Sequence, residues 1–222
     1  MDSLRINLAK YYKESYNLSE KSLTNDKIVV TPGGSSYALT LSFEMLLRNS
    51  KSEGEIIVLA PFFGPYTGMI KLGQGLPVYV DTKDDFEPDL DKIEAKINEK
   101  TRGILINSPN NPTGKVYSDI TIENIIKVAR KHKVAVISDE VYEKFVYNDH
   151  KQFVPLSHFF EENPDVLLIS NTSPSKTYGM IGDRIGYIMS NSEEFIKDIA
   201  ISLGYRFASA PYISQVALDS VF

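Results

Sequence analysis

The sequence contains no cysteine, and this absence excludes several classes of site at once. A disulfide framework and a thiolate metal centre both need cysteine side chains. The three histidines, His132, His150 and His158, do not have the spacing of metal ligands. Any demanding chemistry must therefore come from lysine, carboxylates, tyrosine or a bound organic cofactor.

The chain also lacks a basic cluster and a long apolar run. Its formal net charge is −5 and its lysines are scattered among acids, so nucleic acid is a poor candidate partner. The N-terminal segment has no apolar core of a signal peptide, and no later run approaches a membrane span. We therefore expect a cytoplasmic protein without a membrane partner. With 42% hydrophobic residues among 222, the chain can form one sizeable core.

Short apolar runs rich in β-branched residues recur along the chain, separated by segments with helical patterns. These runs are continuous rather than alternating, which is typical of strands covered by helices on both faces. The sequence therefore predicts an α/β fold of three layers. The seven runs are IVVT (28–31), IIVLA (56–60), PVYV (77–80), GILINS (103–108), VAVISD (134–139), VLLIS (166–170) and IGYIMS (185–190).

The connections between the runs predict the strand directions. Segments such as 36–49 and 120–133 are long enough for crossover helices, which parallel strands need. The link 171–184 is short, contains Pro174 and glycines, and has no helical period, so we expect the last strand to be antiparallel. Near the N-terminus, the apolar spacing of 4–16 predicts a helix that covers the sheet rather than an aromatic binding face.

Ligands of an open α/β sheet bind outside the carboxyl ends of its strands, so the residues that follow each run are informative. After the first run, TPGGSS (31–36) predicts a helix that begins at Ser35 or Ser36. Its free N–H groups and hydroxyls would suit a phosphate. A Gly-Gly turn with a serine N-cap explains the same residues without a ligand.

Three other strand ends also have two interpretations. PFFGPY (61–66) predicts either a stacking platform for a flat ring or buried core aromatics. The turn SPNNPTG (108–114) is rigid and can aim an amide at a fixed point, although turn chemistry alone explains it as well. Asp139 closes an apolar strand, where a carboxylate needs a cation or several donors, unless it serves as an N-cap.

Lys176 lies in the segment SPSKTYGMIGDRIGY (173–187), and a lysine there could simply be an exposed loop residue. The convergence of all five segments argues against that interpretation. An amine can form a Schiff base with an aldehyde, a carboxylate can keep a pyridine ring protonated, and a helix N-terminus with an arginine can hold a phosphate. The ligand that requires this set is pyridoxal 5′-phosphate.

At this point the sequence resembles the class I/II aminotransferases, which belong to the fold type I pyridoxal-phosphate enzymes. The matching motifs are SPNNPTG, SDEVYEKFVY and SPSKTYGMIGDRIGY, supported by VTPGGSSYAL and PFFGPY. They occur in family order and span roughly residues 4–215. The resemblance implies the mostly parallel seven-stranded sheet of that fold, with its last strand antiparallel.

The resemblance also implies roles for individual residues. Lys176 would bind the cofactor aldehyde and shuttle the substrate proton, and Asp139 would pair with the ring nitrogen. Asn111 and Tyr142 would hydrogen-bond the ring hydroxyl. Phe63 would stack on the ring, with Phe62 or Tyr66 as alternatives. The phosphate would be held by Gly34, Ser35, Ser36, Ser173 and Arg184.

By the same resemblance, the chain would transfer an amino group between an amino acid and a 2-oxo acid through a Schiff base on Lys176. Another reaction on the same cofactor (a β-lyase, decarboxylase or cyclase), or a remnant without turnover, is compatible with the same residues. Residues 1–222 would form the cofactor-binding domain, with 203–222 leading toward a smaller C-terminal domain. The resemblance also implies that the full-length form is a homodimer. Asp183 occupies a position where many relatives have tryptophan, and we expect it to face solvent.

Overall fold

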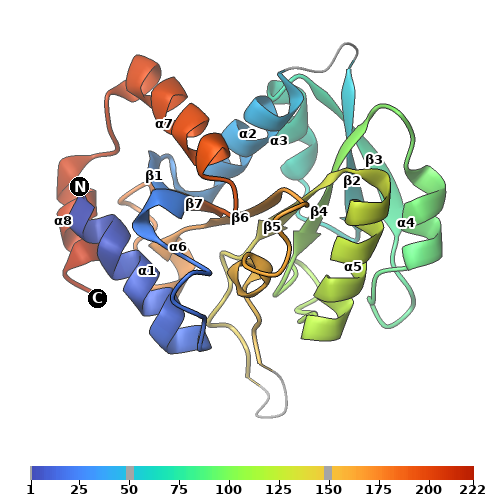
Figure 1. Cartoon of the computed structure of the whole chain (residues 1–222), viewed down its shortest axis with the longest axis horizontal. Coiled ribbons are helices and arrows are strands. Elements are labelled where there is room, and N and C mark those ends of the chain that lie inside the picture. The colour runs from blue at the N-terminus through green and yellow to red at the C-terminus, as the bar shows by residue number, and fades with distance from the viewer. Residues whose placement is uncertain (1, 49–52, 148–151) are drawn as a thin grey trace.

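The computed structural model describes residues 2–48, 53–147 and 152–222, and it places a seven-stranded sheet between two layers of helices (Figure 1). The strands are β1 (Ile28–Pro32), β2 (Gly54–Ala60), β3 (Gly75–Asp81), β4 (Thr101–Asn107), β5 (Ala135–Asp139), β6 (Leu168–Thr172) and β7 (Ile185–Ser190). The α-helices are α1 (Asp2–Tyr16), α2 (Gly34–Leu47), α3 (Tyr66–Leu72), α4 (Leu90–Lys96), α5 (Asp119–His132), α6 (Pro174–Thr177), α7 (Glu193–Phe207) and α8 (Tyr212–Asp219). Two short 3-10 helices are η1 (Asn25–Lys27) and η2 (Leu156–Phe159).

The strands lie in the order β1-β7-β6-β5-β4-β2-β3. β7 is antiparallel to both of its neighbours, β1 and β6, whereas the other adjacent pairs are parallel. The predicted mostly parallel sheet with an antiparallel last strand is therefore confirmed.

β6 lies two residues later than the apolar run that predicted it. Its last residues, Asn171 and Thr172, are polar and buried, and Asn171 pairs with Asp139 of β5. Apolar character does not mark such residues, so the run 166–170 ended too early.

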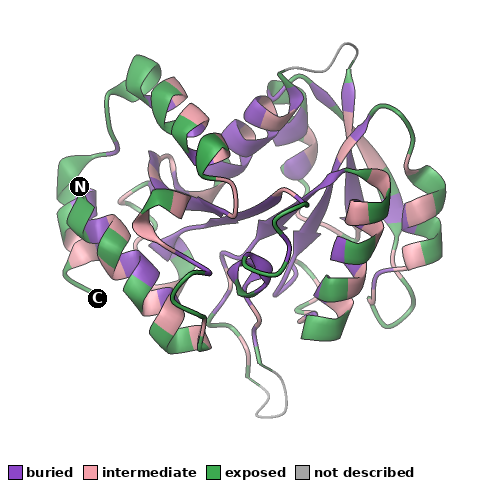
Figure 2. Cartoon of the chain, viewed as in Figure 1, coloured by how far each residue is buried: buried purple, intermediate pink, exposed green. Residues whose placement is uncertain are grey.

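Both faces of the sheet are buried, as Figure 2 shows for the central strands. Successive side chains of a strand point to opposite faces. Ile57 and Ile104 accordingly belong to the core under α1, α4 and α5, while Ile56 and Leu105 belong to the core under α2 and α3. Each β-branched residue therefore contributes to one of two cores, and this is why the runs are continuous.

The helices agree with the sequence except at their ends and in one connection. α1 covers the sheet with Leu4, Leu8 and Tyr12, as predicted. α2 begins at Gly34, one or two residues before the predicted start at Ser35 or Ser36, and position 49 of the prediction lies outside the described residues. The link before β7, predicted without a helix, contains the single turn α6, because four residues are too few to show a period.

Within the ranges that the structure describes, no helix combines the length and the apolar character needed to cross a bilayer.

Gly186 of β7 allows the backbone of α2 to approach this strand closely. A Cβ atom at Gly186 would lie 2.6 Å from the carbonyl carbon of Gly34 and 2.7 Å from its oxygen. We predict that Gly186→Ala lowers the free energy of unfolding by about 1–3 kcal/mol, because backbone atoms on both sides must shift. Denaturant unfolding measures this. Gly182→Ala is the matched control, since a Cβ atom there meets nothing within 4 Å. Equal losses in the two variants would contradict the prediction.

Candidate functional site

A cavity of about 200 Å³ opens where the carboxyl ends of the parallel strands meet the amino end of β7. The reversal of β7 is what brings Arg184, the residue before this strand, to the same edge. The lining residues are Ser35, Ser36, Leu39, Phe63, Tyr66, Met69, Asn107, Asn111, Asp139, Val141, Tyr142, Ser175, Lys176, Ile181 and Arg184.

One end of the cavity is formed by the N-terminus of α2 and by Arg184. The helix starts from Gly33 and Gly34, which have φ angles of 79° and 71° that favour glycine. Arg184 donates from Nη2 to the Gly33 carbonyl at 2.6 Å and from Nη1 to the Ile181 carbonyl at 3.1 Å. A guanidinium has five N–H donors, so others remain for a ligand. This end combines positive charge with free helix N–H groups, which suits an anion.

Gly34 does not line the cavity but makes this arrangement possible. A Cβ atom there would lie 3.2 Å from Nη2 of Arg184. The glycine thus lets the guanidinium lie against the start of α2. Asp183, the neighbour of Arg184, is only half-exposed rather than fully solvated, and no ion pair joins these two residues.

The Asp139 carboxylate lies at the end of β5 and is almost fully buried. Its Oδ2 accepts a hydrogen bond from the Tyr66 hydroxyl at 2.6 Å, and its Oδ1 accepts one from the Val141 N–H at 3.3 Å. No lysine or arginine in the described part of the chain pairs with it. Burial raises the pKa of Asp139 to about 6, although both hydrogen bonds act to lower it. A cation in the cavity would therefore be favourable beside this group.

Asn107, at the end of β4, was not predicted as a site residue. It donates from Nδ2 to the Asp139 carbonyl at 2.9 Å, and its Oδ1 accepts from the Asn111 N–H at 2.7 Å. This one side chain therefore sets the turn that carries Asn111 against the end of β5. The sequence did contain a signal for this residue, because Asn107 ends a predicted buried strand directly before the SPNNPTG motif.

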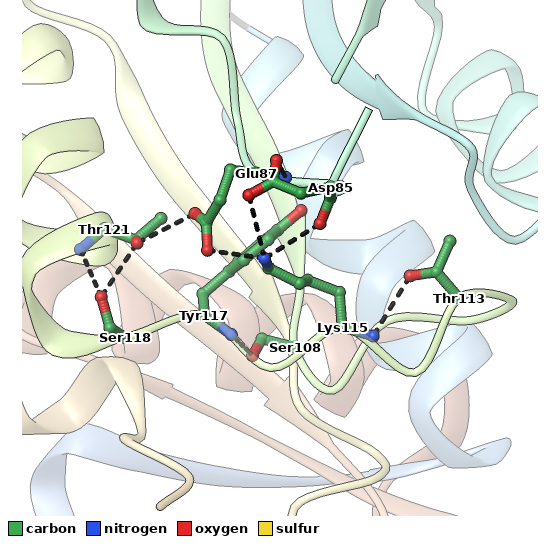
Figure 3. Close-up of polar contacts among 8 residues, drawn as sticks. All are labelled: Asp85, Glu87, Ser108, Thr113, Lys115, Tyr117, Ser118 and Thr121. Carbon is green, nitrogen blue, oxygen red and sulfur yellow. Dashed lines mark hydrogen bonds and ion pairs between the residues drawn. The ribbon is translucent and has the colours of Figure 1, made fainter. Parts of the chain in front are cut away.

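A partly buried lysine, Lys115, also supports this turn (Figure 3). Lys115 forms an ion pair with Glu87 at 2.8 Å and donates to the Asp85 carbonyl at 3.0 Å. The Glu87 carboxylate also accepts from the Thr121 hydroxyl at 3.1 Å. The backbone carbonyl of Lys115 accepts from the Asn110 N–H at 2.8 Å, which closes the turn. The loop before α4 and the start of α5 thus brace the segment that presents Asn111.

Lys176 lies on α6 and reaches the cavity beside Tyr142. Its Nζ atom is 6.0 Å from the centroid of the Tyr142 ring. Ser173 caps α6 by accepting from the Ser175 N–H at 3.1 Å, and its hydroxyl donates to the Ile185 carbonyl at 2.8 Å. Ser173 therefore lies behind the cavity, and Ser175 lines it instead. The capping hydrogen bonds fix the turn that carries the lysine.

The aromatic residues after β2 separate into two groups. Phe62 stacks on Tyr79, with ring centroids 5.1 Å apart, and does not line the cavity. Phe63 lines the cavity and contacts Tyr66 edge to face at 5.5 Å. Since the Tyr66 hydroxyl is bonded to Asp139, Phe63 remains the residue placed to stack on a ligand.

Eight of the ten predicted site residues line this one cavity, and Gly34 and Ser173 support it from behind. Sequence reasoning missed Asn107 and Ser175, and it considered Tyr66 only as a stacking residue. Across 2–48, 53–147 and 152–222, no group of three or more His, Cys, Asp or Glu side chains could hold a metal ion.

Comparison with known proteins identifies the family to which this chain belongs. The sequence profile described as "Aminotransferase class I and II" matches residues 1–221. The chain belongs to the class I and II aminotransferases. It is 34% identical over 208 residues to the aspartate aminotransferase of Sulfurisphaera tokodaii, covering 90% of this chain and 48% of that protein. It is 38% identical over 162 residues to the glutamate-pyruvate aminotransferase of Escherichia coli K12, covering 71% and 38%.

Solved structures agree with this assignment. An aspartate aminotransferase variant from Thermus thermophilus superposes with a TM-score of 0.86 at 30% identity, over 100% of this chain and 58% of that one. The aromatic aminotransferase of Pyrococcus horikoshii gives a TM-score of 0.87 at 27% identity, over 99% and 57%. The chain therefore spans about half the length of the relatives it matches.

The raised pKa of Asp139 predicts a pH dependence that an isosteric variant isolates. The folded chain binds this proton more tightly than the unfolded chain, whose pKa is near 3.8. Relative to Asp139→Asn, the free energy of unfolding of the wild type should therefore rise as the pH falls from 7 to 4, by on the order of 3 kcal/mol. Urea unfolding of both proteins across this range, without ligand, measures the difference. If the difference in free energy of unfolding between the wild type and Asp139→Asn does not change with pH, the raised pKa of Asp139 is refuted.

Proposed function

We propose that this chain binds pyridoxal 5′-phosphate in the cavity and forms the cofactor-binding part of an aminotransferase that acts on an amino acid and a 2-oxo acid. The observation that carries the proposal is the buried Asp139 carboxylate, which shares one cavity with Lys176 and with an anion-binding helix end. Family membership and the names of the relatives support the reaction class.

The residues present fit this cofactor by the chemistry of their donors. Asp139 is buried without a cationic partner in the described chain, and a protonated pyridine nitrogen would supply one. The start of α2 and Arg184 would hold the phosphate, with Ser35, Ser36 and Ser175 as further donors. When bound, the cofactor would supply an electron sink for the carbanion that forms at the substrate α-carbon.

Each protein group near the cavity would then have a defined task. Lys176 Nζ would hold the cofactor aldehyde covalently and, once released by an amino acid, would carry the α-proton. Asn111 and Tyr142 would hydrogen-bond the ring hydroxyl, and Phe63 would stack on the ring. Tyr66 would orient the Asp139 carboxylate through its hydrogen bond of 2.6 Å.

The names of the relatives support the proposal for the substrates, and the family resemblance supports the proposal for the assembly. Matched proteins are named as aspartate, glutamate-pyruvate and aromatic aminotransferases, so the shared substrate class is the amino acids and their 2-oxo acids. We propose that the described chain is the cofactor-binding domain and that the full-length form is a homodimer. Residues 203–222, which comprise the end of α7 and all of α8, would lead to the remaining domain.

The covalent attachment is the first prediction to test. Purified chain mixed with pyridoxal 5′-phosphate should show an absorbance band distinct from that of the free cofactor. Borohydride reduction followed by peptide mapping should then place the label on Lys176, because its amine lines the cavity beside the anion-binding end. Lys176→Ala should lose both the band and the label at this peptide.

Lys71→Met is a suitable control for general loss of a lysine, since Lys71 is exposed on α3 and does not line the cavity. It should retain the label on Lys176. Labelling spread evenly over surface lysines in the wild type would overturn the proposal. An exchange assay with amino acids and 2-oxo acids on the full-length protein would separate transamination from other reactions of the same cofactor.

A further inference from the structure

The turn that follows β5 carries two neighbouring side chains that contact different parts of the molecule. Tyr142 lines the cavity, whereas Glu143 is 3% exposed, does not line the cavity and is hydrogen-bonded to α1. The turn is short and hydrogen-bonded, with the Glu143 N–H donating to the Glu140 carbonyl at 3.0 Å and the Phe145 N–H donating to the Tyr142 carbonyl at 2.8 Å. A displacement of Glu143 would therefore also displace Tyr142.

Helix α1 holds Glu143 through two tyrosine hydroxyls. Tyr11 donates to Oε1 at 2.9 Å, and Tyr12 donates to Oε2 at 2.7 Å. The carboxylate forms no ion pair in the described part of the chain. Lys144 instead lies over the rings of Tyr11 and Tyr16, at 5.0 Å and 4.9 Å from their centroids.

The groups around Glu143 come from several elements. Tyr16 joins Tyr11 and Tyr12 from α1, Tyr187 comes from β7, Glu140 from the same turn, and Tyr178 from the segment after α6. Burial raises the pKa of the Glu143 carboxyl, and its tyrosine donors and Lys144 act against this. Burying a carboxylate whose side-chain hydrogen-bond donors are neutral hydroxyls is costly. The folded chain therefore gives up stability to keep Glu143 at this position.

The same tyrosines also reach the segment that carries Lys176. The Tyr12 hydroxyl is 3.4 Å from the hydroxyl of Tyr187 in β7. Tyr11 packs on Phe222 with ring centroids 4.8 Å apart, and Phe222 packs on Tyr178 at 5.9 Å. Tyr178 follows Lys176 by two residues. The cluster around Glu143 thus contacts both the turn of Tyr142 and the turn of Lys176.

We propose that Glu143 is a positioning residue: held by the hydroxyls of Tyr11 and Tyr12, it fixes the Tyr142 ring beside the Lys176 amine and makes α1 a functional part of the site. The geometry that carries this is the 6.0 Å between Lys176 Nζ and the Tyr142 ring centroid, together with the hydrogen bonds that join the adjacent Glu143 to α1. An aromatic face beside an ammonium stabilises its charged form. Its significance for catalysis rests on the proposed function, but its effect on the Lys176 amine does not.

The test measures the Lys176 amine in the chain without cofactor. The rate at which acetic anhydride labels Lys176 is followed by mass spectrometry as a function of pH, which gives the midpoint of deprotonation. Glu143→Gln and Tyr12→Phe should both lower this midpoint, with labelling at a fixed pH below it increased about threefold or more, because the Tyr142 ring no longer stays beside the ammonium.

Leu8→Ala is the matched control, since Leu8 is buried on the same helix and makes none of these hydrogen bonds. It should destabilise the packing of α1 but leave the midpoint unchanged. Tyr12→Phe separates position from charge, because it keeps the carboxylate while it removes one donor. The proposal is overturned if Leu8→Ala shifts the midpoint as much, if only Glu143→Gln shifts it, or if neither variant does.

A parallel measurement distinguishes this proposal from the proposed function. All three proteins are loaded with pyridoxal 5′-phosphate. The pH midpoint of the cofactor absorbance in Glu143→Gln and in Tyr12→Phe should differ from that of the wild type. If the wild type shows no cofactor band but the labelling midpoint still shifts, the proposed function fails and the role of Glu143 stands.

Discussion

The direction of one strand determines how the site is assembled. β7 lies between β1 and β6 and runs against both, so its amino end meets the carboxyl ends of the parallel strands. Arg184 therefore arrives at the start of α2, where Gly34 leaves space for its guanidinium. Gly186 of β7 also allows the backbone of this strand to approach the backbone at the start of α2 closely. A parallel β7 would have placed this arginine at the opposite edge of the sheet.

Three central strands carry buried polar side chains at or near their carboxyl ends, where burial of a polar group costs stability. Asn107 ends β4, Asp139 ends β5 and Asn171 is the last residue but one of β6, and all three are buried. An apolar residue at the position of Asp139 would avoid the cost of burying a carboxylate. The chain retains the acid and orients it with Tyr66 and with the backbone. Retaining this acid therefore costs stability of the folded chain, which an apolar residue would not.

The residues that contact the cavity are held by others that do not. Lys115 and Glu87 brace the turn of Asn111, Ser173 caps the helix of Lys176, and Glu143 anchors the turn of Tyr142. The partners of Lys115 and Glu143 come from elements distant in sequence, namely the loop before α4 and helix α1. The cavity thus depends on the packing of the helices around the sheet as much as on its own motifs.

The sequence by itself determined the α/β class and the antiparallel last strand, and its motifs, read through the family resemblance, selected eight residues that line one cavity. It could do so because buried strands leave continuous apolar runs and because the polar motifs directly follow them. The sequence did not predict the last two residues of β6 or the one-turn helix α6, because buried polar residues and four-residue helices leave no periodic signal. Only the tertiary structure decided that Phe63 rather than Phe62 lines the cavity, that Tyr66 serves Asp139, and that Glu143 joins α1 to the site. These contacts join residues far apart in the chain, and their partners are selected by packing, which no local pattern encodes.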